Sequence, residues 1–190
     1  MKQVIFTGAA TALVTPFDKN GDISWGEIER LVEFQIEGGI DAIVACGTTG
    51  EAATMTTEDH IKVIQFIIDR AKGRVPVIAG TGCASTKETV ALTNKAVELG
   101  IETCLVVCPF YNKPTQEGLY NHFKTLAEST KANIMLYNIP IFVGINIDAP
   151  TVHELAKIPN IIGIKDEAGI NPTQVTDYFL ATEDVNPEFV

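Results

Sequence analysis

The sequence predicts an α/β fold in which parallel strands alternate with helices. Six short, largely apolar segments of strand length recur along the chain, with amphipathic segments between them. Continuous apolar strands of this kind are typical of a sheet that is covered on both faces. No linker or change of composition divides the 190 residues, so we expect one domain over residues 1–190.

The six expected strands are separated by helix-start and turn signals. In chain order they are residues 9–14, 41–45, 75–79, 103–108, 133–138 and 161–165. Between them, Ser24 with Glu27 and Ser85 with Glu88 have the spacing of helix capping boxes, and Thr57 is expected to cap another helix. Strand–helix–strand units make right-handed crossovers, which places the strands parallel in one sheet.

Two architectures accommodate such units. An open doubly wound sheet usually carries a glycine-rich phosphate loop after its first strand, and residues 15–21 have no such pattern. The other is a TIM (β/α)8-type barrel, a fold that typically needs about 250 residues. The sequence therefore predicts a barrel of this type, truncated to about six β/α units, which is an incomplete β/α barrel catalytic domain.

Composition excludes several classes of function. The chain is 46% hydrophobic and 20% charged, which is typical of a globular protein. Its net charge of −10 argues against nucleic-acid binding, which needs clustered Lys and Arg. No apolar run has the length of a membrane span, and residues 4–17 fit a first strand better than a signal peptide. We expect a cytoplasmic protein that binds neither nucleic acid nor membrane.

Cysteine and histidine usage predicts neither a metal site nor a disulfide framework. None of the four cysteines forms a C-x-x-C pair, and the three histidines are not at ligand spacing. These residues are Cys46, Cys83, Cys104, Cys108, His60, His122 and His153. Buried thiols in a reducing compartment are the expected state. We therefore expect no metal and no cofactor.

Lys165 is the candidate nucleophile because it ends an otherwise apolar strand. Burial disfavours an ammonium, and a neutral lysine amine forms Schiff bases with carbonyl compounds. The alternative is a solvated lysine at the point where the strand meets water, among Asp166 and Glu167. This segment alone favours the alternative, so other segments must decide between the two interpretations.

Three further segments at strand ends carry groups suited to chemistry, and in a barrel reacting groups lie at the carboxyl ends of strands. Residues 47–51 (Gly-Thr-Thr-Gly-Glu) offer amides and hydroxyls to a carboxylate, although an ordinary polar turn explains them equally well. Residues 109–114 form an aromatic loop between two prolines. The strand 133–138 carries Tyr137 near its end, where a tyrosine more often packs in a core than transfers protons.

Together these four segments resemble the dihydrodipicolinate synthase family, within the N-acetylneuraminate lyase superfamily of pyruvate-dependent class I aldolases. The matching residues are 47–51, 109–114, 137–140 and 163–165, in order and at family spacing. The resemblance implies a lyase that condenses pyruvate with a small aldehyde, aspartate semialdehyde, in lysine and diaminopimelate biosynthesis. It also implies a homo-oligomer, either a dimer or a tetramer.

The resemblance implies a role for each matching residue. Lys165 corresponds to the lysine that forms the Schiff base with pyruvate, and Tyr137 to the tyrosine that relays protons at that carbon. Thr48 extends this relay, and Tyr111 corresponds to a tyrosine that reaches into the neighbouring subunit's site. The residues implied to bind pyruvate are Gly47, Thr48 and Thr49.

One position departs from the family pattern. Members usually continue as Tyr-Asn-x-Pro-x-Arg-x-Gly, whose arginine binds the carboxylate of aspartate semialdehyde, and Phe142 stands at that place here. A phenyl ring cannot make a bidentate, charge-assisted contact. Either Lys113 supplies the charge, or the protein is a related 2-keto-acid aldolase for sialic acid or a keto-deoxy sugar acid. A non-catalytic truncated barrel fragment is the remaining alternative.

Overall fold

The structure, a computed structural model, describes residues 5–169 and 171–189. Six strands form one sheet in the order β1-β2-β3-β4-β5-β6, and every neighbouring pair is parallel. The strands are β1 Ala10–Ala12, β2 Ala42–Ala45, β3 Val77–Gly80, β4 Thr103–Val107, β5 Asn133–Asn138 and β6 Ile161–Asp166. Each predicted strand is confirmed, with ends within two residues of the expected ones.

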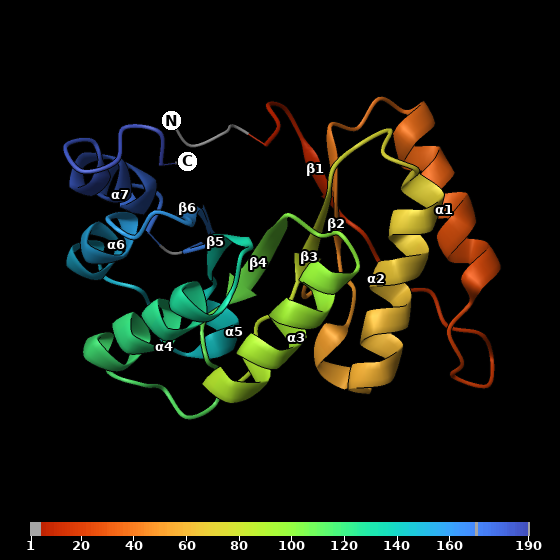
Figure 1. Cartoon of the computed structure of the whole chain (residues 1–190), viewed down its shortest axis with the longest axis horizontal. Helices are drawn as coiled ribbons and strands as arrows, with labels where there is room; N and C mark the ends of the chain where they lie inside the picture. Colours follow the sequence, from red (N-terminus) through yellow and green to blue (C-terminus); the bar gives the residue numbers. More distant parts are fainter. Residues whose placement is uncertain (1–4, 170, 190) are drawn as a thin grey trace.

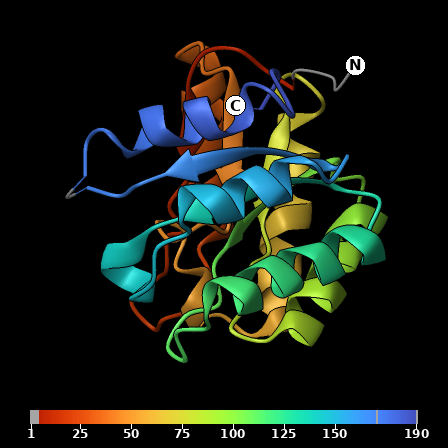
Figure 2. The same cartoon turned by 90° about the vertical axis from the view of Figure 1, so that its left-hand side faces the viewer.

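The helices surround the outer side of a curled sheet, which confirms the predicted truncated barrel (Figure 1). They are α1 Trp25–Glu37, α2 Thr57–Ala71, α3 Thr86–Glu98, α4 Gln116–Ser129, α5 Pro140–Val143, α6 Ala149–Ala156 and α7 Gln174–Thr182, with a 3-10 turn η1 at Ala52–Thr54. Figure 2 shows α6 beside α4; β6 and α7 come after α6 in the chain. Among the residues the structure describes, no helix has the length and apolarity needed to cross a membrane.

One of the three predicted helix caps forms as expected, and two differ from the structure. The Ser85 hydroxyl accepts a hydrogen bond from the Glu88 amide at 3.4 Å, as the capping box predicts. Ser24 is the N-cap of α1 but makes no side-chain cap bond. Thr57 is the first residue of α2 and not its cap, because Thr56 accepts from the Asp59 amide at 3.1 Å. Adjacent threonines have equal capping chemistry, so the sequence alone could not separate them.

The core lies between the sheet and the helices. Apolar side chains from both layers are fully buried there, among them Ile43, Ile78, Leu136 and Phe123. All four cysteines are free thiols; Cys46, Cys104 and Cys108 are buried, and Cys83 is partly exposed. Because the strands are parallel, their carboxyl ends meet at one edge of the sheet, and the residues that follow them are brought together.

Candidate active site

Tyr137 and Lys165 are direct neighbours across the β5–β6 pair. The Lys165 Nζ lies 4.4 Å from the centroid of the Tyr137 ring. Tyr137 is 4% exposed, so the ring is fixed by packing while its hydroxyl reaches the carboxyl edge. A phenol and an amine are therefore held side by side by the register of the sheet.

Lys165 is less buried than its apolar strand predicts. Its side chain is 35% exposed, and its Nζ forms an ion pair with Glu167 Oε1 at 2.6 Å. The Tyr137 hydroxyl donates to the same oxygen at 3.5 Å. Sequence analysis did not single out Glu167 as functional. The available signal was its spacing from Lys165, because residues two apart in an extended chain project to the same side.

A buried polar network lies behind this pair and joins β5, β6 and α7. Asn138 is fully buried, and its Nδ2 donates to Asn146 Oδ1 at 2.9 Å, to Asp166 Oδ1 at 2.9 Å and to the Tyr178 hydroxyl at 3.2 Å. Gln174 Nε2 donates to the same two oxygens, of Asn146 and Asp166, at 3.0 Å each. Burial raises the pKa of Tyr178, so this hydroxyl stays protonated. Asn138 and Asp166 directly follow Tyr137 and Lys165, so the network holds the strand ends that carry these two side chains.

The residues after β2 form a compact turn. The Gly50 amide donates to Gly47 O at 3.1 Å, and the Glu51 amide donates to Thr48 O at 3.0 Å. The buried Thr15 hydroxyl ties this turn to the segment after β1, donating to Gly50 O at 2.7 Å. A Cβ at Gly50 would lie 3.0 Å from a backbone oxygen, which explains the glycine there. Thr48 and Thr49, in this turn, are exposed.

A cavity of about 660 Å³ opens at the carboxyl ends of β2 to β5. Gly47, Thr48 and Tyr137 line it, so the structure brings these three predicted residues to one cavity. Phe142 and the buried His60 line it too. Burial lowers the pKa of His60, whose Nε2 lies 2.8 Å from Gly80 O, so this imidazole is neutral near pH 7.

The other predicted site residues lie outside the lining of this cavity. Neither Thr49 nor Lys165 is among the lining residues, although Lys165 Nζ lies 4.4 Å from the ring centroid of Tyr137, which does line the cavity. Tyr111 is 89% exposed, and its φ of 73° is a left-handed conformation that is uncommon for a tyrosine. A single chain therefore brings Tyr137 of β5, with Lys165 of β6 beside it, to the cavity that Thr48 lines. It leaves Tyr111 exposed to solvent.

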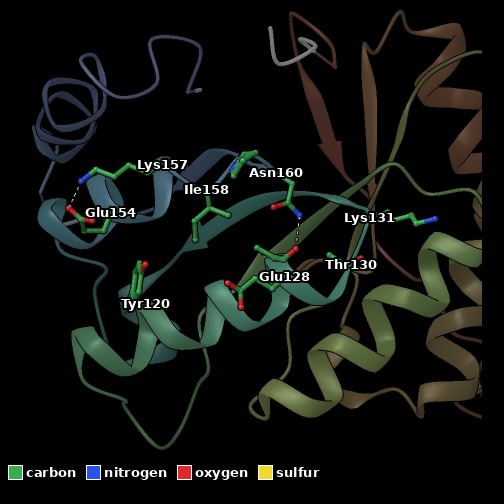
Figure 3. A pocket seen from close by; sticks show the side chains of 10 residues that line it. Tyr120, Glu128, Thr130, Lys131, Glu154, Lys157, Ile158 and Asn160 are labelled. Atoms are coloured by element: carbon green, nitrogen blue, oxygen red, sulfur yellow. Dashed lines mark hydrogen bonds and ion pairs between the residues drawn. The ribbon is translucent and has the colours of Figure 1, made fainter.

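A second cavity, of about 680 Å³, lies between α4 and α6 (Figure 3). Lys131 and Asn160, which line it, come just before β5 and β6, so it is at the amino ends of the strands. Its other charged groups include the ion pair of Glu154 with Lys157 at 2.6 Å. None of the predicted site residues lines it. Over residues 5–169 and 171–189, no group of three or more His, Cys, Asp or Glu side chains is placed to hold a metal ion.

A sequence profile of the Dihydrodipicolinate synthetase family matches residues 5–184. The chain belongs to this family. Two members, the 4-hydroxy-tetrahydrodipicolinate synthases of Pseudomonas putida and Syntrophus aciditrophicus, are 52% and 56% identical to it over 165 residues. Each alignment covers 87% of this chain and 56% of the relative. The chain thus spans a little over half the length of these relatives.

Solved structures of the family share the fold. The dihydrodipicolinate synthase of Acinetobacter baumannii, crystallised in complex with pyruvate, is 46% identical and superposes with a TM-score of 0.89. The match covers 94% of this chain and 62% of that one. The predicted family and the predicted barrel-type fold are both confirmed.

Proposed function

We propose that this chain carries the pyruvate-binding half of a 4-hydroxy-tetrahydrodipicolinate synthase site, within one incomplete-barrel catalytic domain. The observation that supports it most is the pairing of Lys165 with Tyr137, whose ring centroid lies 4.4 Å from the amine on the neighbouring strand. Family membership supports it independently, as does the pyruvate complex of the Acinetobacter relative. In this proposal Lys165 forms a Schiff base with pyruvate.

Imine formation needs a nucleophilic amine, a proton donor at the carbonyl oxygen and a hold on the carboxylate. Lys165 supplies the amine, and the Tyr137 hydroxyl is the neighbouring proton donor. The amides after Thr49 are taken up by the turn itself, so a carboxylate would rely on the amides and hydroxyls of Thr48 and Thr49. Thr48 lines the same cavity as Tyr137, which suits a bound pyruvate between the turn and the β5–β6 edge.

Trapping of the imine tests the proposal. Borohydride reduces an imine to a stable amine, so pyruvate with borohydride should label the folded chain once, at Lys165. Intact-mass measurement gives the number of labels, and peptide mapping gives the position. Lys165→Arg, which keeps the charge, should abolish the label. A label at another lysine, or no label on a sample that is folded by circular dichroism, contradicts the Schiff-base assignment.

The second substrate is proposed to be aspartate semialdehyde, on which the enamine formed from the imine would act. Phe142 bears on this choice, because it lines the cavity and is 67% exposed. Lys113 lies close by: a Cβ at Gly144 would be 2.7 Å from Lys113 Cε and 3.5 Å from its Nζ. The Lys113 side chain therefore lies beside Gly144, which is two residues after Phe142, and we propose that its ammonium receives the carboxylate of the aldehyde.

A related 2-keto-acid aldolase is the second candidate, and Phe142 is the observation that favours it. If the phenyl ring marks a different aldehyde, Phe142→Arg should raise kcat/KM for aspartate semialdehyde by roughly 30- to 1,000-fold, the worth of a charge-assisted contact. If Lys113 already provides the charge, the gain should be small and Lys113→Met should cause the loss instead. Condensation kinetics of the two variants beside the unmodified chain separate the candidates.

We also propose a homo-oligomer with Tyr111 at a subunit contact. An exposed aromatic side chain held in a left-handed conformation, on a loop between two prolines, suits a surface that a partner covers. The strands β1 and β6 are the outermost strands of the described sheet, and edge strands are common sites of association. Sedimentation should show a dimer or tetramer at micromolar concentration, weakened by Tyr111→Asp. A stable folded monomer contradicts this.

A biosynthetic enzyme with free cysteines suits the cytoplasm, where we place it.

A further inference from the structure

Glu167 is placed at the reacting amine by the backbone as well as by its side chain. Its amide donates to Asn138 O at 2.8 Å, which continues the β5–β6 pairing past the end of β6. Its Oε1 then lies 2.6 Å from Lys165 Nζ and 3.5 Å from the Tyr137 hydroxyl. One carboxylate oxygen thus contacts both groups that the proposed function assigns to the chemistry.

We propose that Glu167 is a further catalytic residue, which takes a proton from the Lys165 ammonium and returns it when water leaves during imine formation. The inference rests on the proposed function, because it concerns the same Schiff base. It assigns a general acid–base role to a carboxylate, whereas the family resemblance assigned roles only to Lys165, Tyr137, Thr48, Thr49, Gly47 and Tyr111.

A base is needed beside Lys165 because this side chain is partly exposed and ion-paired. The Lys165 side chain is 35% exposed, and its ammonium is ion-paired with the Glu167 carboxylate at 2.6 Å. The ammonium has no lone pair, so it must lose a proton before it can attack a carbonyl carbon. A candidate base must lie within hydrogen-bond reach of that proton, and Glu167 at 2.6 Å satisfies this condition.

The step balances in protons and electrons. Glu167 takes one proton from the ammonium, and the amine lone pair forms the C–N bond while the carbonyl π electrons move to oxygen. Tyr137 gives its proton to this oxygen and recovers one from nitrogen, which produces a neutral carbinolamine. The Glu167 carboxylic acid then protonates the hydroxyl, the C–O bond breaks, and the nitrogen lone pair forms C=N. The net change is ammonium plus ketone to protonated imine plus water, with both side chains restored.

A second lysine–glutamate ion pair, at a similar distance but without a neighbouring tyrosine of the proposed site, supplies a matched control. Lys157 and Glu154 also approach to 2.6 Å, and Glu154 is about as exposed as Glu167. That pair lies at the carboxyl end of α6, with Glu154 in the helix and Lys157 as its C-cap, where both line the second cavity. Surface ion pairs contribute little to stability in general, so neither substitution should unfold the chain.

The test measures the rate of imine formation by stopping the reaction with pyruvate at set times with borohydride. Glu167→Gln should slow labelling of Lys165 by about a hundredfold at neutral pH, typical for loss of an acid–base group. The residual rate should rise more steeply with pH than that of the unmodified chain, because solvent must then remove the proton. Glu167→Asp should recover part of the rate, and Glu154→Gln should label at the unmodified rate.

Added formate distinguishes proton transfer by Glu167 from a role limited to positioning Lys165. If Glu167 transfers protons, formate should accelerate labelling of Glu167→Ala in proportion to the formate concentration; if it only positions Lys165, formate should have no effect. Glu167→Ala also replaces Glu167→Gln if the latter does not fold. Labelling of Glu167→Gln at the unmodified rate and pH profile overturns the inference. So does a slow Glu167→Ala that formate leaves unchanged. If the unmodified chain itself is not labelled at Lys165, the proposed function fails first, and this inference with it.

Discussion

The carboxyl end of the β5–β6 pair and the loops after β2 and β4 hold their side chains in different ways. Tyr137 and Asn138 are buried, and strand register fixes them against Lys165 and Asp166. Thr48, Thr49 and Tyr111 are exposed on loops. The proposed reacting groups, Tyr137 and Lys165, are thus part of the sheet, whereas the residues proposed to contact substrate and partner lie in local turns.

The two regions also differ in what determines their conformation: long-range hydrogen bonds in the first, and strained backbone turns in the second. The buried network behind β5 and β6 joins residues 28 and 40 positions apart, from Asn138 to Asp166 and to Tyr178. The loop residues Tyr111 and Lys113 instead adopt φ values of 73° and 49°, which cost about 1–3 kcal/mol each for non-glycine residues. Damage to the first region should therefore lower stability, and damage to the second should lower binding.

The largest expected effect is on stability, from Asn138→Ala. The change removes four hydrogen bonds of a fully buried side chain, to Asn146, Asp166, Tyr178 and the Ile147 amide. At about 1 kcal/mol each, the free energy of unfolding should fall by about 4 kcal/mol. Thr49→Ala in the exposed turn is the control and should change it by about 0.5 kcal/mol or less. Urea denaturation of the two variants measures both, and equal losses would erase the contrast between the regions.

Tyr137→Phe should have the next largest effect, and it should fall on rate. The phenyl ring keeps the packing against Lys165 and removes only the hydroxyl, so turnover should slow by about a hundredfold or more, with some imine formation retained. Steady-state kinetics and the borohydride label report these two quantities separately. Unchanged turnover would show that another group relays the proton.

The smallest expected effect is on pyruvate binding, from Thr48→Val and Thr49→Val. Each substitution removes one hydroxyl at an exposed turn, so KM for pyruvate should rise about tenfold while the unfolding free energy stays within about 0.5 kcal/mol. Thermal melts beside the kinetics separate the two quantities. A large loss of stability from either variant would mean that the turn is part of the folded core.

The fold was predictable because apolar runs between turn signals mark buried parallel strands. The pairing of Tyr137 with Lys165 was predictable too, since each lies near the carboxyl end of one of two consecutive strands. The environment of Lys165 was not predicted: an apolar run indicates burial, but the Glu167 side chain, two residues on in the extended chain, lies 2.6 Å from the amine. The Asn138 network joins distant residues that no local pattern connects, and α5, a single turn after Ile139, is too short to show periodicity.

A crystal of this chain grown with pyruvate tests the central claim most directly. The account predicts continuous density from Lys165 Nζ to the second carbon of pyruvate, with the Tyr137 hydroxyl beside that carbon and the carboxylate at Thr48 and Thr49. Pyruvate bound without a covalent link to Lys165, or seated only in the cavity between α4 and α6, would contradict it.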